Sequence, residues 1–153
     1  MRYSTKTRYG LRLLNYLSHI YFLKGPDHFT QLTEVAHAED ISFKYLEQIV
    51  RVLKPLQILD SARGMKGGYR LSASPREFPL HEIFNCLEGN THLAPCLDCC
   101  YPCSRSHCCE TRLLWIDLED YIQTYLKAKT LDDMRHSFGE KAQPKGPMMR
   151  ETA

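Results

Sequence analysis

The 153-residue sequence predicts a mainly α-helical fold with one two-stranded hairpin and a long helix near the C-terminus. Three observations carry this prediction. Apolar residues recur at three- and four-residue steps between residues 9 and 53, as the buried faces of helices require. A basic, glycine-rich segment at residues 63–68 separates two short β-prone runs. A second helical pattern, at residues 114–125, is too apolar for a small domain to cover alone.

Three helices are expected before the hairpin. The first starts near Tyr9 and stops at Gly25-Pro26-Asp27. The second has Thr30 as its N-cap and buries Leu32, Val35 and Ala36. The third is capped by Ser42, ends before Pro55 and buries Leu46, Ile49, Val50 and Leu53. Long polar side chains then face outward near the start of the third helix, which is typical either of a helix that reads the DNA major groove or of an ordinary solvated surface.

The hairpin favours the first of these readings. Its strands are predicted at residues 58–61 and 69–72, and its tip is Arg63-Gly64-Met65-Lys66-Gly67-Gly68. A helix-turn-helix followed by such a hairpin is a winged helix. Arg63, Lys66 and Arg70 give the wing three cations that suit phosphates or a narrow minor groove.

The composition sets limits on other classes. The net charge of +2 is too small to indicate nucleic-acid binding without the placement just described. The longest apolar run is far shorter than the ~20 residues of a membrane span, so no transmembrane helix is expected. Arg2, Lys6, Arg8 and Arg12 interrupt any secretory signal, and we expect a cytoplasmic protein.

Six of the seven cysteines lie within residues 96–109. In a reducing compartment such crowding favours metal ligation over disulfides. Thiolates suit both iron-sulfur clusters and structural zinc, and the spacing does not separate them; a metal-free thiol switch is the third reading. The seventh, Cys86, lies on a helix predicted from Leu80 to Leu87 and capped at Gly89, where we expect a small buried hydrophobe.

Four stretches together resemble a known family. They are MRYSTKTRYGLRLLNYL, SFKYLEQIVRVLK, SARGMKGGYRLS and LLWIDLEDYIQTYLKAKTLDDM. In this order they resemble the IscR/NsrR/CymR-type (Rrf-two) family of winged-helix transcription regulators over residues 1–136. The resemblance implies a homodimer whose C-terminal helix pairs with its symmetry mate, and a palindromic operator with half-sites about one helical turn apart. The apolar stripe of the expected dimerisation helix is Leu114, Leu118, Tyr121, Ile122 and Tyr125.

The matching motifs also assign DNA contacts. By position, Lys44, Glu47 and Gln48 take the base-reading places, and Glu47 suits the amino group of cytosine. Arg63 takes the place of the family's minor-groove arginine. The complete predicted DNA-contacting set is Ser42, Lys44, Tyr45, Glu47, Gln48, Arg51, Arg63 and Lys66.

The resemblance further implies an iron-sulfur cluster. Family members that sense through a cluster carry three cysteines ahead of a Leu-Trp pair, here Leu114-Trp115, and this register implies Cys96, Cys103 and Cys109 as ligands. The chain departs from the family where some members have a ligating histidine, here Arg112, and where others have an N-terminal carboxylate, here Arg8. The fourth ligand is therefore open, and so is the choice between [2Fe-2S], [4Fe-4S] and, as the alternative, zinc; the candidates are Cys99, Cys100, His107 and Cys108.

These patterns predict three regions: a DNA-binding head at 1–75, a cysteine loop with a dimerisation helix at 76–137, and a disordered tail at 138–153. The predicted function is an iron-sulfur-dependent, redox- or iron-responsive transcription regulator, with a zinc-bound or thiol-switch regulator as the alternative. An electron-transfer protein is disfavoured, because a carrier has no use for a recognition helix and a basic wing. An enzyme is not expected, because no cysteine has a recognisable base and orienting partner.

Overall fold

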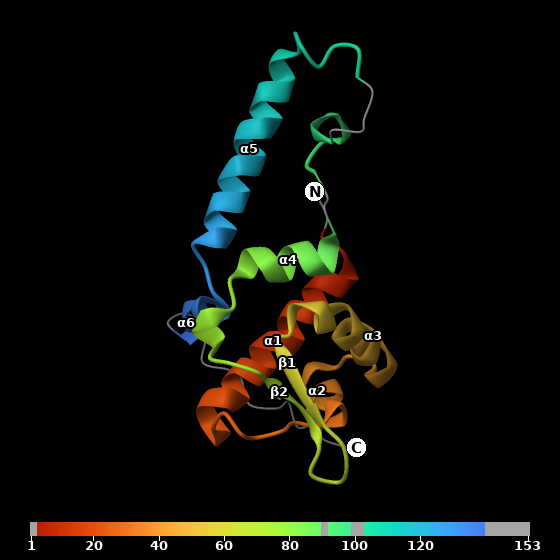
Figure 1. Cartoon of the computed structure of the whole chain (residues 1–153), viewed down its shortest axis with the longest axis vertical. Helices are drawn as coiled ribbons and strands as arrows, with labels where there is room; N and C mark the ends of the chain where they lie inside the picture. The colour runs from red at the N-terminus through yellow and green to blue at the C-terminus, as the bar shows by residue number, and fades with distance from the viewer. Residues whose placement is uncertain (1–2, 90–91, 99–102, 140–153) are drawn as a thin grey trace, which may run out of the picture.

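The computed structural model describes residues 3–89, 92–98 and 103–139, so the tail predicted at 138–153 lies almost entirely outside the described residues. The molecule is elongated: a helical head carries a hairpin at one end, and a long helix rises from the other (Figure 1). This confirms the predicted fold class. The described elements are α1 (Thr5–Lys24), α2 (Leu32–Glu39), α3 (Phe43–Leu53), η1 (Lys54–Leu56), β1 (Leu59–Ala62), β2 (Gly68–Leu71), η2 (Pro75–Glu77), α4 (Leu80–Glu88), η3 (Pro95–Leu97), α5 (Glu110–Lys127) and α6 (Leu131–Gly139).

Helix α1 begins earlier than its apolar pattern indicated. Ser4 caps it, because its hydroxyl oxygen accepts a hydrogen bond from the Thr7 amide at 3.2 Å. The helix therefore starts at Thr5 rather than near Tyr9. It ends where predicted, since Gly25 follows Lys24 with a φ of 94° that other residues rarely adopt.

The prediction that Thr30 caps α2 is wrong. The N-cap is Gln31, whose side chain makes no capping hydrogen bond. Thr30 is extended instead and exchanges two backbone hydrogen bonds with Tyr69, of 2.9 and 2.8 Å. The segment before α2 thus lies along the hairpin as a third, very short strand, a long-range pairing that a local capping pattern does not reveal. The cap predicted for α3 is confirmed: the Ser42 hydroxyl accepts from the Tyr45 amide at 3.2 Å.

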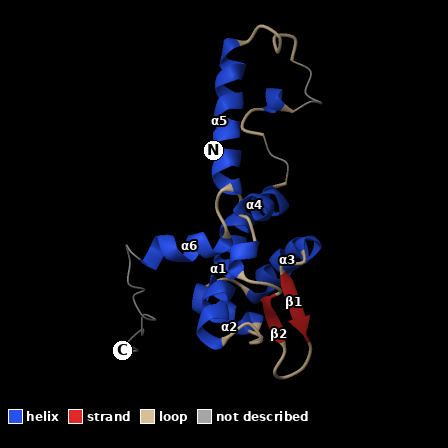
Figure 2. Ribbon diagram, turned by 60° about the vertical axis from the view of Figure 1, so that its left-hand side comes forward, coloured by secondary structure: helices blue, strands red, loops and turns tan. Residues whose placement is uncertain are grey.

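The hairpin, hereafter the wing, consists of β1, β2 and the tip at residues 63–67. Its strands pair antiparallel from Leu59 opposite Leu71 to Ala62 opposite Gly68. Each strand is displaced by one residue toward the tip from its predicted position, because the ladder continues until the glycines turn the chain. Figure 2 shows the two strands beside α2 and α3.

One apolar core joins the head to the following helices. It contains the predicted buried face of α3, the apolar side of α1, and side chains from α4, the base of α5 and the start of α6. Each fully buried leucine or isoleucine contributes about 1.5–3 kcal/mol relative to an exposed one. Fully buried members include Leu13, Leu14, Leu46, Ile49, Leu53, Ile83, Leu87 and Leu131. The predicted α4 is confirmed, and Gly89 is its C-cap.

Helix α5 is fixed to the head only at its lower end. The amide of Leu80 donates to the carbonyl of Lys129 at 2.8 Å, and the amide of Leu131 donates to the carbonyl of Phe78 at 2.9 Å. Of the α5 side chains, Leu126 alone is buried in the monomer. The upper turns stand clear of the head (Figure 1). No helix among the described residues is long and apolar enough to cross a membrane.

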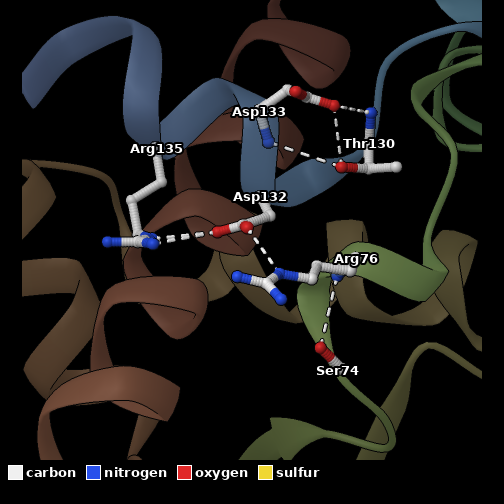
Figure 3. Close-up of polar contacts among 6 residues, drawn as sticks. All are labelled: Ser74, Arg76, Thr130, Asp132, Asp133 and Arg135. Carbon is white, nitrogen blue, oxygen red and sulfur yellow. Dashed lines mark hydrogen bonds and ion pairs between the residues drawn. The ribbon is translucent and has the colours of Figure 1, made fainter.

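Helix α6 was not foreseen, and a buried carboxylate holds it to the head (Figure 3). Asp132, only 6% exposed, accepts from Arg76 of η2 at 3.0 Å and from Arg135 of its own helix at 3.0 and 3.1 Å. The helix start is closed by Thr130, whose amide and hydroxyl both donate to Asp133, at 2.8 and 2.9 Å. The Thr-x-x-Asp spacing is the sequence signal that would have found this helix.

Candidate DNA interface and cysteine loop

The recognition helix α3 turns a polar face outward. Lys44, Gln48 and Arg51 are exposed or half-buried, as is Glu47, while the apolar side of the helix lies in the core. The outward orientation predicted for these four side chains is confirmed. Long donors and acceptors near the start of an exposed helix are what a major-groove interface needs.

Two other predicted DNA contacts have structural roles at the same helix start. The Ser42 oxygen is the α3 cap, and its hydroxyl proton stays free to donate to a phosphate. The Tyr45 ring packs edge-on against Tyr9 of α1, with ring centroids 5.7 Å apart and planes at 89°. Tyr45 therefore fixes α3 on α1. A DNA contact from either residue remains a prediction.

A groove separates α3 from the wing. Its lining comes from the start of α2, from α3 and from the wing, and includes Gln31, Thr33, Phe43, Glu47 and Tyr69. Of the predicted base-reading residues, Glu47 lines the groove, and the wing contributes its glycines and Tyr69. A DNA backbone lying in this groove would have α3 on one side and the wing on the other.

The wing presents two of its three predicted cations. Arg63 and Lys66 are exposed at the tip. Arg70 instead points back: it bonds Asp27 at 2.6 Å and Asp60 at 3.2 Å, and its guanidinium lies 4.8 Å from the centroid of the Phe29 ring. The hydrogen bond to Asp27 is the main reason that the pKa of Arg70 is raised. Arg70 thus anchors the wing to the α1–α2 connection, contrary to the expectation that it grips phosphates.

At the other end of the molecule, Cys109 is the N-cap of α5. Its sulfur lies 3.1 Å from the Thr111 hydroxyl. That hydroxyl, followed by the backbone N–H of Arg112, lowers the pKa of Cys109. A lowered pKa favours the thiolate, which is the form that binds metals and reacts with oxidants.

Cys96 is held near the same helix start. It lies in η3, and its carbonyl accepts a hydrogen bond from Nε of Arg112 at 3.2 Å. The segment that carries Cys96 is therefore attached to the first turn of α5, whose N-cap is Cys109. Arg112, noted in the sequence as a departure from the family pattern, is the residue that joins them.

The remaining candidate ligands are less constrained. Cys103 is half-buried, and His107 and Cys108 are exposed. Cys99 and Cys100 lie outside the described residues. Within the described part of the chain, no three side chains of His, Cys, Asp or Glu are grouped closely enough to hold a metal ion. Cys96, Cys103 and Cys109 belong to one loop but do not form a closed ligand set.

Cys86 has a separate environment, as expected. Its thiol donates to the carbonyl of Val52 at 2.9 Å, which links α4 to α3. Partial burial raises the pKa of Cys86, so its thiol is less reactive than that of Cys109.

A second attachment of the cysteine loop to α5 is not apparent from the sequence. Nδ1 of His92 lies 2.7 Å from Oε1 of Glu119, and the Leu93 amide donates to Oε2 at 3.0 Å. His92 is one of several scattered histidines in the sequence. No local spacing links it to Glu119, because the two residues meet only when the chain folds back along α5.

The upper part of α5 exposes the predicted apolar stripe. Four of its five residues are 40–72% exposed, whereas Ile122 packs against the core. Leu113 and Trp115, on either side of Leu114 in the sequence, are also exposed. The four exposed stripe residues are Leu114, Leu118, Tyr121 and Tyr125.

Comparisons with known proteins agree with this arrangement. The model of the Rrf2 family, described as an iron-dependent transcriptional regulator, matches residues 3–137. The regulator CymR of Bacillus subtilis is 33% identical over 134 residues, which cover 88% of this chain and 89% of that protein. The solved structure of CymR, the global cysteine regulator of B. subtilis, superposes with a TM-score of 0.73 at 28% identity, covering 90% of this chain and 98% of that one. The structure of IscR from T. potens superposes with a TM-score of 0.70 at 26% identity, covering 94% of this chain and 93% of that one.

Proposed function

Because the chain belongs to the Rrf2 family of DNA-binding transcriptional regulators, we propose that it acts as a homodimer whose operator affinity depends on an iron-sulfur cluster in the cysteine loop. The family relatives are regulators and not enzymes, as expected from the sequence. The site of action is then the cytoplasm, where the operator lies.

The DNA contacts follow from the exposed face of the head. Lys44, Glu47 and Gln48 read base edges in the major groove, and Arg51 extends that face. Ser42 and Tyr45, at the start of α3, contact the adjoining backbone. Arg63 and Lys66 bring the wing to the minor groove beside the same half-site.

The homodimer is supported by α5. A soluble monomer rarely exposes an apolar face of this kind, and a two-fold axis through the stripe, perpendicular to α5, buries it on both copies at once. The four exposed stripe residues then lie between the two long helices, and the two heads lie at the outer ends of the assembly, each ready for one arm of a palindrome.

The single observation that carries the cluster proposal is the attachment of the Cys96 segment to the first turn of α5, whose N-cap is Cys109. Arg112 makes this attachment, and the lowered pKa of Cys109 makes its thiolate more accessible than that of an ordinary thiol. Cys103, half-buried and between them in sequence, is the third ligand. Cys99, Cys100, His107 and Cys108 are the candidates for the fourth. A bound cluster supplies a group that responds to iron, oxidants or small reactive gases.

The path from the loop to the head runs along α5. Arg112 and Glu119 fix the loop to α5, and the backbone bonds at Leu80 and Leu131 fix the base of α5 to the head. A change in loop order is thereby transmitted to the relative position of the two heads. A coupling of about 1–3 kcal/mol suffices to change operator occupancy several-fold or more.

A metal-free thiol switch is the second candidate, because the lowered pKa of Cys109 also favours oxidation, and Cys108 stands next to it. A relative 30% identical, CymR of Staphylococcus aureus, has been solved in an oxidized form. Structural zinc is the third candidate, since the same thiolates bind it.

The test is an anaerobic purification with iron, acid-labile sulfide and zinc analysis and a visible absorption spectrum. It is repeated on the Cys96, Cys103 and Cys109 to alanine triple variant, with Cys86→Ala as the matched control. Iron with equal sulfide that is lost only in the triple variant supports the cluster. Stoichiometric zinc without sulfide, or metal-free protein whose operator affinity follows the thiol redox state, assigns the loop to the third or second candidate instead.

A further inference from the structure

The tip of the wing carries an apolar side chain where a DNA-facing turn needs none. Met65 is 94% exposed, the highest value among the large hydrophobic residues of the described chain. It stands between the exposed cations Arg63 and Lys66. A lone exposed methionine on a mobile surface turn is common and needs no explanation. The backbone of this tip, however, is fixed.

Two hydrogen bonds and one close backbone approach hold the tip. Nε2 of Gln31, at the start of α2, donates to the Met65 carbonyl at 2.9 Å, and the Gly67 amide donates to the Gly64 carbonyl at 3.0 Å. A Cβ at Gly67 would collide with the carbonyl of Ala62, so the chain closes on itself more tightly than any other residue permits. The position from which the Met65 side chain projects is therefore fixed relative to α2.

The tip is also narrow. Of residues 63–68, three are glycines, so the tip has only three side chains that extend beyond Cβ: one methionine and two cations. The minor groove is about 6 Å wide, and a tip with few side chains is what it admits. In the proposed placement the two cations lie against the phosphates on either side, and the methionine between them is the side chain that can reach the floor of the groove.

We propose that Met65 is a wedge that the wing inserts between base pairs in the minor groove, so that the operator is chosen partly for a deformable step at that position. Methionine has an unbranched, adaptable side chain, and apolar side chains of this kind unstack base steps in proteins that bind the minor groove. Pyrimidine–purine steps such as TA unstack most easily, so the wing position favours them. The inference rests on the proposed placement of the wing in the minor groove.

The experiment uses the full-length protein with its native cysteine loop. Duplexes are selected from a random-sequence pool by the wild type and, in parallel, by Met65→Ala and Met65→Leu. Affinities are then measured on the wild-type consensus duplex and on a copy in which the flexible step at the wing is replaced by a stiff A-tract step. A 2-aminopurine placed at that step reports unstacking by its fluorescence. Lys66→Ala is the matched control for loss of a wing contact without loss of the wedge.

The expected result is specific to the wedge. Met65→Ala loses about tenfold in affinity for the flexible duplex, loses the preference over the A-tract copy, and loses the fluorescence rise, whereas Met65→Leu keeps all three. Lys66→Ala lowers the affinity for both duplexes alike, and it reduces the slope of log affinity against log salt concentration by about 0.9. The thermal midpoints of all variants stay unchanged, because Met65 is outside the core.

Two results overturn the proposal. In the first, Met65→Ala binds both duplexes as the wild type does. In the second, Met65→Ala lowers the affinity for both duplexes equally and leaves the fluorescence change as in the wild type, so the side chain would be a non-specific contact. Failure of the proposed function would be seen at the selection step, before any variant is compared, because the wild type would then enrich no duplex from the pool.

Discussion

The wing and the cysteine loop are both short, cation-bearing segments, and they lie at opposite ends of the molecule (Figure 1). The wing is fixed by backbone pairing with Thr30, by the Arg70 ion pairs and by glycines that leave no space for a Cβ. The described part of the loop is fixed by a few side-chain contacts, chiefly from Arg112 and Glu119 of α5.

The difference shows where each segment obtains its order. The wing is complete in the protein alone, as a DNA-reading element must be if it is to meet its groove without a large entropic cost. The described thiols of the loop do not form a closed ligand set. In the proposed cluster-bound protein, the metal would supply order that these few side-chain contacts do not.

The largest expected effect comes from breaking the wing. Gly68 has a φ of 145°, and a Cβ there would meet the Thr30 carbonyl, so Gly68→Ala should lower the free energy of unfolding by about 3 kcal/mol. Gly64→Ala is the control: it shares a positive φ of 102° but has open space around it, and should cost about 1 kcal/mol. Urea unfolding followed by circular dichroism measures both. Equal losses would show that the approach of Thr30 is unimportant.

The second-largest effect is expected where α6 is attached to the head. Asp132→Ala removes a buried carboxylate that binds Arg76 and Arg135, and should cost about 2 kcal/mol, again by urea unfolding. Arg76→Ala removes an arginine whose side chain is 72% exposed and should cost less than about 1 kcal/mol. A larger loss for Arg76 than for Asp132 would contradict this account of how α6 is held.

A smaller effect is expected in the loop. Arg112→Ala should cost about 1 kcal/mol of stability. Its main result should be faster hydrogen exchange at residues 93–97 and at the first turn of α5, because Cys96 loses its attachment. Arg105→Ala, which removes an exposed arginine, is the control. Unchanged exchange in Arg112→Ala would show that the loop is held by other contacts, and would remove the main support for the cluster site.

The smallest effect is a pH dependence at the start of α6. The Thr130 amide and hydroxyl lower the pKa of Asp133 below its usual 3.8. A lowered pKa in the folded state gives stability that is complete above the unfolded value and is lost as the pH falls through the folded value. Asp133→Asn should therefore destabilise the fold by about 0.5–1 kcal/mol at pH 6, seen as a lower thermal midpoint, and by progressively less as the pH falls below 3.8. A constant difference across this range would refute the assignment.

Much of the head could be predicted from the sequence, because its signals are local. The Ser42 cap, the apolar face of α3 and the glycine-rich tip each act within a few residues, and each lies close to its predicted position. The predictions that failed concern residues whose partners are distant in sequence. Thr30 has the residue type of a helix cap, yet its bond to Tyr69 decides its conformation, and Arg70 is paired with acids from other segments.

The candidate sites divide in the same way. The exposed face of α3 followed from helical periodicity, whereas the role of Arg112 did not, because its hydrogen bond spans sixteen residues of irregular chain. The contact of His92 with Glu119 is equally distant in sequence and equally hidden there. The three cluster ligands were assigned by their position relative to the family's Leu-Trp pair and not by the spacing of the cysteines, and this assignment stays a prediction.

The pairing of Thr30 with Tyr69 has a consequence for how binding can be switched. Because it joins the wing to the chain just before α2, which packs against α3, the pairing limits how far the wing and α3 can move apart. In the proposed dimer, regulation then acts mainly on the offset between the two heads. Adding one base pair between the arms shifts the second by about 3.4 Å and turns it by about 35°. A regulator of this design is sensitive to the length of the spacer between the arms, whatever bases the spacer contains.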